Sequence, residues 1–128
     1  MRRIYDLFSA GDRDGMRALL AEDFEWDYFG PKSIPWAGKY RGAAGFDRFF
    51  ENVAGVIEPI HFEPREFIDA GDKIVVTGIS CARAVASGVS YEAQWVNVFW
   101  IEGGRVKRLL DLYETASVLR ALEAAPRS

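Results

Sequence analysis

The sequence predicts an α+β fold in one domain that spans residues 1–128. Apolar side chains recur at helical spacing near the start of the chain and again over residues 43–56. After Pro59, aromatic and β-branched residues concentrate in three or four consecutive segments, which are separated by turn-forming glycines. Helices that are segregated from a run of antiparallel strands cover one face of the sheet, and this arrangement defines the fold class.

Two short helices are expected at the start of the chain. The first ends at Gly11, a residue that favours the end of a helix. Asp12 or Asp14 can cap the second, because a short carboxylate accepts hydrogen bonds from the free amides of a first turn. We expect Leu20 to lie on the buried face of this second helix, which ends near Asp23.

A short strand and an irregular loop follow. Residues 24–29 alternate between aromatic and acidic side chains, as in a strand with one buried face. The expected inward residues are Phe24, Trp26 and Tyr28. Residues 30–38 contain too much proline and glycine for regular structure. Because this loop still has to bury Ile34 and Trp36, we expect it to fold over an opening.

The rest of the chain predicts a helix, a meander of strands and a last helix. The helix over residues 43–56 carries an apolar stripe, Phe46, Phe49, Phe50, Val53 and Ile57. Strands are expected over residues 60–69, 73–84, 90–101 and 105–115. Pro64 cannot donate to a ladder, so its strand lies at an edge or is bulged. The last helix covers residues 116–124, and a frayed tail covers residues 126–128.

The turn between the last two strands decides which side chains share a face. A three-residue loop with Gly104 left-handed places Ile101 opposite Arg105, whereas a two-residue Gly103-Gly104 loop pairs Glu102 with Arg105. A slip of one residue inverts every side chain. We favour the three-residue loop, because it gathers the polar groups on one face. That face then carries Trp95, Asn97, Phe99, Leu109, Asp111 and Tyr113.

The composition argues against several classes of function. A net charge of −3 with scattered arginines argues against nucleic-acid binding. The chain has no run of 18 apolar residues and no signal-peptide pattern, so we expect a cytoplasmic protein without a membrane partner. The single Cys81 agrees with a reducing compartment. The single His61 leaves no usual metal site, and no glycine-rich phosphate loop is present, so we expect neither a metal nor a cofactor.

Asp111 is the best candidate for chemistry. Its sequence neighbours are leucines, so its carboxylate either reaches solvent or has a raised pKa. With a raised pKa it could remove a proton next to a carbonyl, while Asn97 and Tyr113 donate hydrogen bonds to the enolate oxygen. The structural alternative is an ion pair with Arg108 or a backbone cap. At 49% hydrophobic residues, the chain also has rings to line a cavity. The expected lining residues are Trp26, Tyr28, Trp36, Tyr40 and Trp95.

The opposite face of the last hairpin is also apolar, and no element of the chain remains to cover it. An antiparallel sheet with one face in water normally alternates apolar and polar residues. We therefore expect a homodimer through this outer face, which carries Val96, Val98, Trp100, Leu110 and Leu112.

Several short motifs occur in a recognisable order. They are Ala10-Gly11-Asp12, residues 19–24, Pro35-Trp36-Ala37-Gly38, residues 71–76 and Tyr113-Glu114-Thr115-Ala116. In this order they resemble the SnoaL-like branch of the NTF2-like superfamily over essentially the whole chain. The resemblance implies a cone, in which a strongly bent antiparallel sheet wraps around three to four helices, with a ligand cavity at the open end. It commonly implies dimers, but it does not imply one reaction.

The resemblance transfers only in part to individual residues. SnoaL-type cyclases carry a cavity-facing histidine followed fourteen residues later by an acidic base, and these positions are Asn97 and Asp111 here. The base of ketosteroid isomerases falls on Tyr28, which argues against that mechanism. Glu114 stands where many relatives have aspartate, so either Asp111 or Glu114 is the pocket acid.

The leading functional hypothesis is a cofactor-independent enzyme of the cyclase or isomerase type. It would act on a small apolar carbonyl compound, with Asp111 as the base. The alternative is a binding module that holds an apolar small molecule in the same cone without transforming it.

Overall fold

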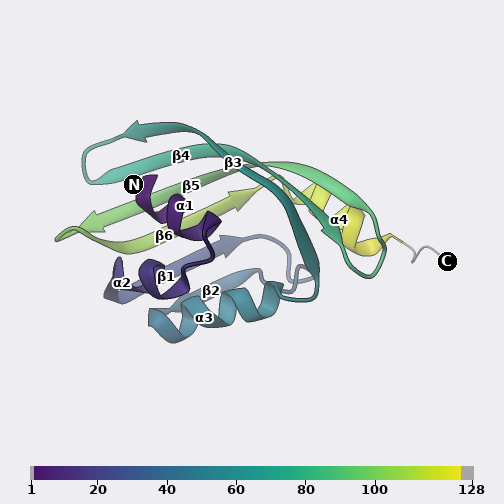
Figure 1. Ribbon diagram of the computed structural model, residues 1–128, viewed down its shortest axis with the longest axis horizontal. Helices are drawn as coiled ribbons and strands as arrows, with labels where there is room; N and C mark the ends of the chain where they lie inside the picture. Colours follow the sequence, from purple (N-terminus) through teal and green to yellow (C-terminus); the bar gives the residue numbers. More distant parts are fainter. Residues whose placement is uncertain (1, 125–128) are drawn as a thin grey trace.

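A six-stranded sheet forms the body of the protein in the computed structural model, which describes residues 2–124 (Figure 1). The elements are α1 (Arg2–Ser9), α2 (Arg13–Ala18), β1 (Leu20–Phe29), β2 (Gly38–Arg41), α3 (Gly42–Val53), β3 (Ile57–Asp69), β4 (Lys73–Ala84), β5 (Ser90–Glu102), β6 (Arg105–Tyr113) and α4 (Thr115–Glu123). The strand order is β2-β1-β6-β5-β4-β3. The α+β fold is confirmed. The expected tail over residues 126–128 lies outside the described residues.

The sheet is mixed, whereas the resemblance implied an antiparallel one. Four of its strand pairs are antiparallel, but β1 runs parallel to β6. The difference arises because the chain leaves β1 for β2 and α3, passes through the whole meander, and returns beside β1 only with its last strand. The parallel pair places the first and last strands of the chain side by side, with β2 on one side of the pair and β5 on the other.

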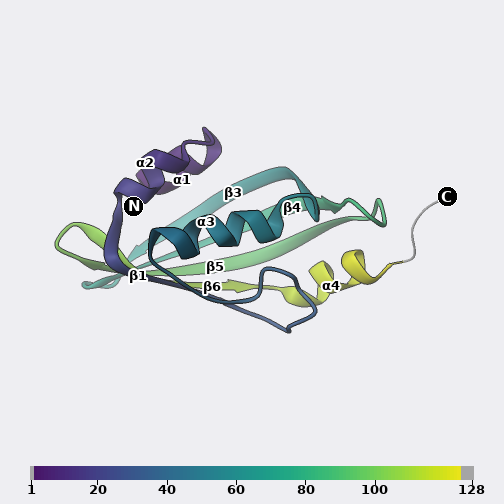
Figure 2. The same ribbon diagram turned by 90° about the horizontal axis from the view of Figure 1, so that it is seen from below.

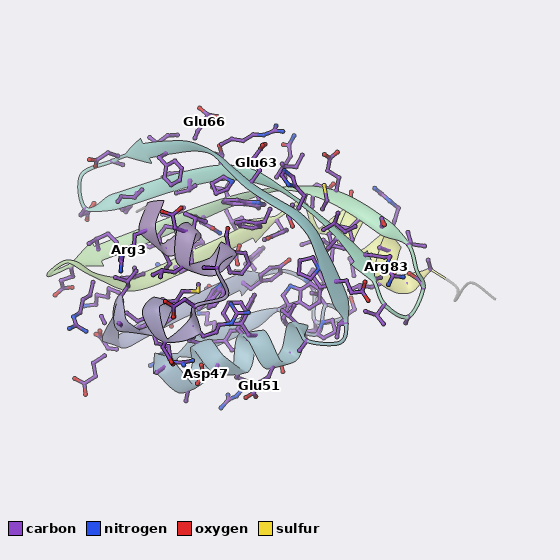
Figure 3. The ribbon with its side chains drawn as sticks, viewed as in Figure 1. Arg3, Asp47, Glu51, Glu63, Glu66 and Arg83 are labelled. Carbon is purple, nitrogen blue, oxygen red and sulfur yellow. The ribbon has the colours of Figure 1, made fainter. Side chains whose placement is uncertain are left out.

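Helices cover one face of this bent sheet. Figure 2 shows α1, α2 and α3 on the same side, while α4 lies towards the end of the sheet, where it contacts β5 and β4. The inner face is buried by large apolar side chains, among them Trp26, Val76, Trp95, Phe99 and Leu109. The charged side chains of Asp47 and Glu51 on α3, and of Glu63 and Glu66 on β3, lie at the periphery (Figure 3). Within residues 2–124, no helix combines the length and hydrophobicity needed to cross a bilayer.

The second helix is shorter than predicted. Asp12 caps α2 by accepting a hydrogen bond of 2.8 Å from the backbone N–H of Gly15, as expected. The helix ends at Ala18, however, and Leu20 already belongs to β1. The reason is strand pairing: the backbone N–H of Val106 donates to the carbonyl of Leu19 over 2.8 Å. A distant strand thus overrides the local helical pattern.

The other boundaries agree more closely with the sequence. β4 has the predicted bounds, while β3 begins at Ile57, which we had placed on the helix stripe. Pro64 lies on the edge strand and next to a register shift, so both expected explanations of its position hold. Strand β2 was not predicted, because its four residues are mostly exposed and its partner strand, not its own sequence, defines it.

The β5–β6 turn differs from our preferred form, but the predicted face is correct. The turn is the two-residue type, with Glu102 opposite Arg105 and both glycines at positive φ, 59° and 76°. Three residues later Trp100 pairs with Arg108, so Lys107 is an extra, bulged residue. The bulge restores the pairing of odd positions with odd positions that a three-residue loop would have given, although each partner is shifted by two residues. Asn97 therefore lies directly opposite Asp111.

The loop between β1 and β2 buries its two apolar residues, as predicted. Ile34 is 1% exposed and Trp36 is 3% exposed. Two turns hold the loop, through hydrogen bonds from the N–H of Ile34 to the carbonyl of Pro31 and from the N–H of Ala37 to the carbonyl of Ile34. The hydroxyl of Tyr40 donates to the carbonyl of Trp36 over 2.7 Å. The loop is thereby fixed over one end of the inner face.

Candidate functional site

A cavity of about 150 Å³ lies between the inner face of the sheet and the helices. Its walls come from α1, β1, α3 and the inward residues of β5 and β6, and aromatic rings dominate them. Pro59 and His61 line it as well and are exposed, so the cavity reaches the surface beside the start of β3. The cavity is thus apolar with a small number of polar side chains, the usual composition of a small-molecule site.

Asp111 is the acid of this cavity. It lies on the inward face of β6, is 5% exposed, and accepts two side-chain hydrogen bonds. The indole N–H of Trp26 donates to Oδ2 over 3.2 Å, and the amide of Asn97 donates to Oδ1 over 2.9 Å. Burial raises the pKa of Asp111 to about 7, while these two donors act in the opposite direction. The carboxyl therefore changes its charge near neutral pH.

Tyr5 fixes the orientation of Asn97. The hydroxyl of Tyr5, on α1, donates to Oδ1 of Asn97 over 2.8 Å. Since an amide oxygen only accepts and the amide nitrogen only donates, this contact directs the Asn97 nitrogen towards Asp111. Neither Tyr5 nor the indole N–H of Trp26 was predicted to hold a residue of the site in place. The only available signal was a tyrosine on the apolar stripe of the first helix.

Two tyrosines lie beside this cluster. Tyr113 is partly buried, and its ring stacks on Tyr28 with a centroid distance of 5.4 Å. Both line the cavity. Burial and the nearby Asp111 raise the pKa of both hydroxyls above their ordinary range, so both remain protonated donors at neutral pH. Tyr28 is 2% exposed and its hydroxyl makes no hydrogen bond within the described residues.

The five expected lining residues separate into two groups. Trp26, Tyr28 and Trp36 line the cavity, and the ring of Trp26 also stacks on Phe49 at 3.8 Å. Tyr40 and Trp95 are buried but lie outside the lining. The hydroxyl of Tyr40 holds the β1–β2 loop, as described above. Both residues therefore support the walls from behind.

Trp95 packs where only glycine fits on the neighbouring strand. Its ring stacks on Phe62 with a centroid distance of 4.7 Å and lies over Gly78. A Cβ atom at Gly78 would lie 2.3 Å from the ring of Trp95 and 2.4 Å from the carbonyl oxygen of Glu63. The absent side chain of Gly78 thus makes room for the indole.

Glu114 is not in the cavity. It is exposed and caps α4, where its carboxylate accepts a hydrogen bond of 2.7 Å from the backbone N–H of Ser117. It also contacts the hydroxyl of the same serine. These hydrogen bonds from Ser117 lower the pKa of Glu114. Of the two acids that the sequence left open, Asp111 is the one that faces the cavity.

His61 and Cys81 are cross-strand neighbours on β3 and β4. The side chain of His61 is 58% exposed, and its Nε2 lies 3.8 Å from a carboxylate oxygen of Glu63. The thiol of Cys81 instead contacts Glu92 on β5 at 4.0 Å. His61 is therefore a residue of the cavity rim and surface. The described part of the chain contains no group of three or more histidine, cysteine or acidic residues arranged for a metal ion.

Solved structures share this architecture. An NTF2-like protein of unknown function from Burkholderia pseudomallei is 32% identical, with a TM-score of 0.88 and a match that covers 96% of this chain and 94% of that chain. An NTF2-like protein from Burkholderia xenovorans is 27% identical, with a TM-score of 0.82 and coverage of 94% and 90%. TerC, co-crystallized with polyporic acid, is 26% identical, with a TM-score of 0.86 and coverage of 94% and 93%. A search of curated protein sequences gave no significant match.

The fold and the cavity together define a class of protein. A bent sheet closes around helices, which is the architecture of an NTF2-like cone, and leaves an apolar pocket with Asp111 buried in its wall. The family model described as a SnoaL-like domain matches residues 1–109. The chain belongs to this SnoaL-like family.

Proposed function

We propose that the protein is a cofactor-independent enzyme that removes a proton from the carbon next to a carbonyl group of a small apolar substrate. The observation that carries the proposal is the buried carboxyl of Asp111, whose pKa is about 7 and which lies in the wall of an apolar cavity. A general base is most effective when its pKa is close to the working pH. Such bases contribute roughly 10²- to 10⁴-fold in rate.

Each polar neighbour of Asp111 has a part in this mechanism. The N–H groups of Trp26 and Asn97 hold the carboxylate in one orientation. The amide nitrogen of Asn97 has a second N–H, which can donate to the substrate oxygen as negative charge develops on it. Tyr113 supplies another protonated donor from the same wall. The apolar rings exclude water and thereby strengthen these interactions.

The test is hydrogen exchange at the carbon next to a carbonyl. A panel of small ketones is incubated in D₂O with the protein, and loss of the exchangeable proton signal is followed by NMR. We expect catalysed exchange that increases with pH through about pH 7, because the carboxylate is the active form. Asp111→Asn should reduce the rate by at least roughly 100-fold.

Glu114→Gln is the matched control, since it removes a nearby carboxylate that lies outside the cavity. It should leave the exchange rate unchanged. Exchange that survives Asp111→Asn, or that no ketone of the panel shows, contradicts the proposal.

Two observations favour the alternative of a binding module. Both carboxylate oxygens of Asp111 already accept a hydrogen bond, and Asn97 stands where cyclase relatives have a histidine. A module of this kind would bind the same ketones without accelerating exchange. Saturation-transfer NMR, which detects binding directly, therefore separates the two functions.

We also propose that the protein forms a homodimer through the outer face of β5 and β6. Five apolar side chains on this face are only partly buried: Val96, Val98, Trp100, Leu110 and Leu112. Phe29, which is 71% exposed, pairs with Leu112 across the β1–β6 junction and extends the patch. A second copy of the chain would cover it. Light scattering at micromolar concentration should give the mass of a dimer, and Val98→Lys should give a monomer. A monomeric wild type would contradict this proposal.

A further inference from the structure

Three buried side-chain polar atoms lack a hydrogen-bond partner within the described residues: the hydroxyl of Tyr28, Nε1 of Trp95 and Nε of Arg108. Burial of an unsatisfied polar group costs free energy, so each such group needs an explanation. Trp95 and Arg108 lie outside the cavity lining, whereas Tyr28 is part of it. The cavity wall therefore contains a buried hydroxyl whose proton has no acceptor among the described residues.

The position of Tyr28 relates it directly to Asp111. The parallel pairing of β1 and β6 places the two residues opposite each other, and both side chains line the cavity. The indole of Trp36 meets the Tyr28 ring edge-on with a centroid distance of 6.2 Å, and the hydroxyl of Tyr91 belongs to the same cavity wall. An indole N–H can donate but cannot accept a hydrogen bond. Since the described residues provide no acceptor within hydrogen-bond distance, the hydroxyl proton of Tyr28 is free for an acceptor that enters the cavity.

The size of the cavity limits what can enter. A volume of about 150 Å³ lies below the roughly 300–1,000 Å³ of typical drug-sized sites. An apolar cavity of about 150 Å³ in another protein accommodates benzene. The rings of Trp26, Phe49 and Trp36 give this cavity flat walls. A compound with one ring of five or six atoms fits within it, whereas a second fused ring would have to extend towards the opening beside β3.

We propose that the ligand is a monocyclic ketone whose carbonyl oxygen accepts a hydrogen bond from the Tyr28 hydroxyl, with the adjacent carbon facing Asp111. This assignment of substrate class rests on the proposed function for its chemical step. In that step the C–H bond breaks, its proton moves to the carboxylate of Asp111, and its electron pair forms a C=C bond. The carbonyl electrons move to oxygen, and the resulting enolate keeps the hydrogen bond from Tyr28. Where the ketone carries a C=C bond between its β and γ carbons, return of the proton to the γ carbon moves that bond into conjugation with the carbonyl and completes an isomerisation without any co-reactant.

Binding measurements test the ligand assignment separately from the chemistry. Three probes are titrated by ligand-observed NMR: cyclohexanone, methylcyclohexane, which lacks the oxygen, and 2-decalone, which has a second fused ring. We expect cyclohexanone to bind more tightly than either of the others. Tyr28→Phe should weaken cyclohexanone binding by about tenfold, since the lost hydrogen bond is buried, and should leave methylcyclohexane binding unchanged.

The two-probe design distinguishes a specific role from a structural one. If Tyr28→Phe only distorts the cavity, both probes weaken equally, and the proposal is wrong. Equal or tighter binding of 2-decalone, or no binding of cyclohexanone, would also overturn it. Asp111→Asn should still bind cyclohexanone while losing proton exchange. Binding without any exchange in the wild type would therefore contradict the proposed function and leave the ligand assignment intact.

Discussion

Two carboxylates three residues apart, Asp111 and Glu114, have opposite environments in this protein. Asp111 is enclosed by the inner face of the sheet, and burial raises its pKa to about 7. Glu114 is exposed at the start of α4, and its hydrogen bonds from Ser117 lower its pKa. The change occurs where β6 ends at Tyr113 and the backbone N–H of Glu114 donates to the carbonyl of Gln94.

The difference teaches that position on an element, and not residue type, decides what an acid can do here. A carboxylate on the inward face of a strand loses its water and becomes a candidate base. A carboxylate at a helix start gains N–H donors and becomes a structural cap. The two acids should consequently affect stability, pH dependence and turnover in different ways.

The largest expected contrast is in how Asp111 couples stability to pH. A pKa raised from 3.8 to about 7 corresponds to roughly 4 kcal/mol of differential stability. The folded state keeps its proton over a pH range in which the unfolded state has lost it. Stability from this group is therefore present below about pH 4 and is lost as the pH rises through about 7. Relative to Asp111→Asn, the wild type should become less stable by roughly this amount between pH 4 and pH 8.

Urea unfolding of both proteins at several pH values measures this difference. Any effect of the asparagine amide on stability that does not depend on pH cancels, because the test uses only how the stability difference between the two proteins changes with pH. A difference that stays flat from pH 4 to pH 8 would show that Asp111 titrates normally in the folded protein.

A smaller effect should follow from loosening the support of Asp111. Tyr5→Phe leaves the amide oxygen of Asn97 without its donor, at a cost of about 1 kcal/mol. With Asn97 less fixed, its donation to Asp111 weakens, and the pKa of Asp111 should rise further. Carbon-detected NMR titration of the carboxyl group measures the change.

Tyr40→Phe is the matched control for this experiment. The hydroxyl of Tyr40 also makes buried hydrogen bonds, to the carbonyl of Trp36 and from the amide of Asn52, but not to the Asp111 cluster. It should reduce stability without moving the titration of Asp111. A shift of equal size in both variants would mean that Tyr5 acts only through general packing.

The smallest effect is expected at the other acid. Glu114→Ala removes an exposed helix cap and should cost less than about 1 kcal/mol at neutral pH. Folding lowers the pKa of Glu114, so its contribution to stability is fully present when the pH is above the pKa of the unfolded state. This contribution is lost as the pH falls through the lower pKa of the folded state. The difference from the wild type should thus shrink in acid, opposite in sign to the Asp111 effect. Thermal unfolding at pH 7 and pH 3 checks this, and an equal cost at both would remove the contrast.

The parts of the fold that repeat a local pattern could be predicted from the sequence. The face of β5 and β6 that carries Asp111 was predicted correctly, because gathering the polar groups on one face favoured the pairing of odd positions, although the turn expected to produce that pairing was wrong. The buried loop residues Ile34 and Trp36 were also predicted, because apolar residues among glycines and prolines need cover.

The parts that depend on distant pairing could not be predicted. The local sequence around Leu20 predicts a helix, but its pairing with Val106 makes it part of β1. Strand β2 forms because β1 provides an edge to pair with. The role of Tyr5 likewise depends on a hydrogen bond across 92 residues of sequence. The free hydroxyl of Tyr28 could not be predicted either, because the lack of a hydrogen-bond partner can be recognised only once the positions of all its neighbours are known.

The extra residue at Lys107 gives the β5–β6 hairpin an unusual sensitivity to chain length. The two-glycine turn alone would orient Asp111 towards the outer surface, and the bulge reverses that outcome. Deletion of one residue there would exchange the inner and outer side chains of the strand that follows, although no site residue had been substituted. Among relatives, gain or loss of the buried acid can therefore arise from an insertion or deletion in this hairpin, and alignments should place their gaps at the bulge before comparing the positions that follow it.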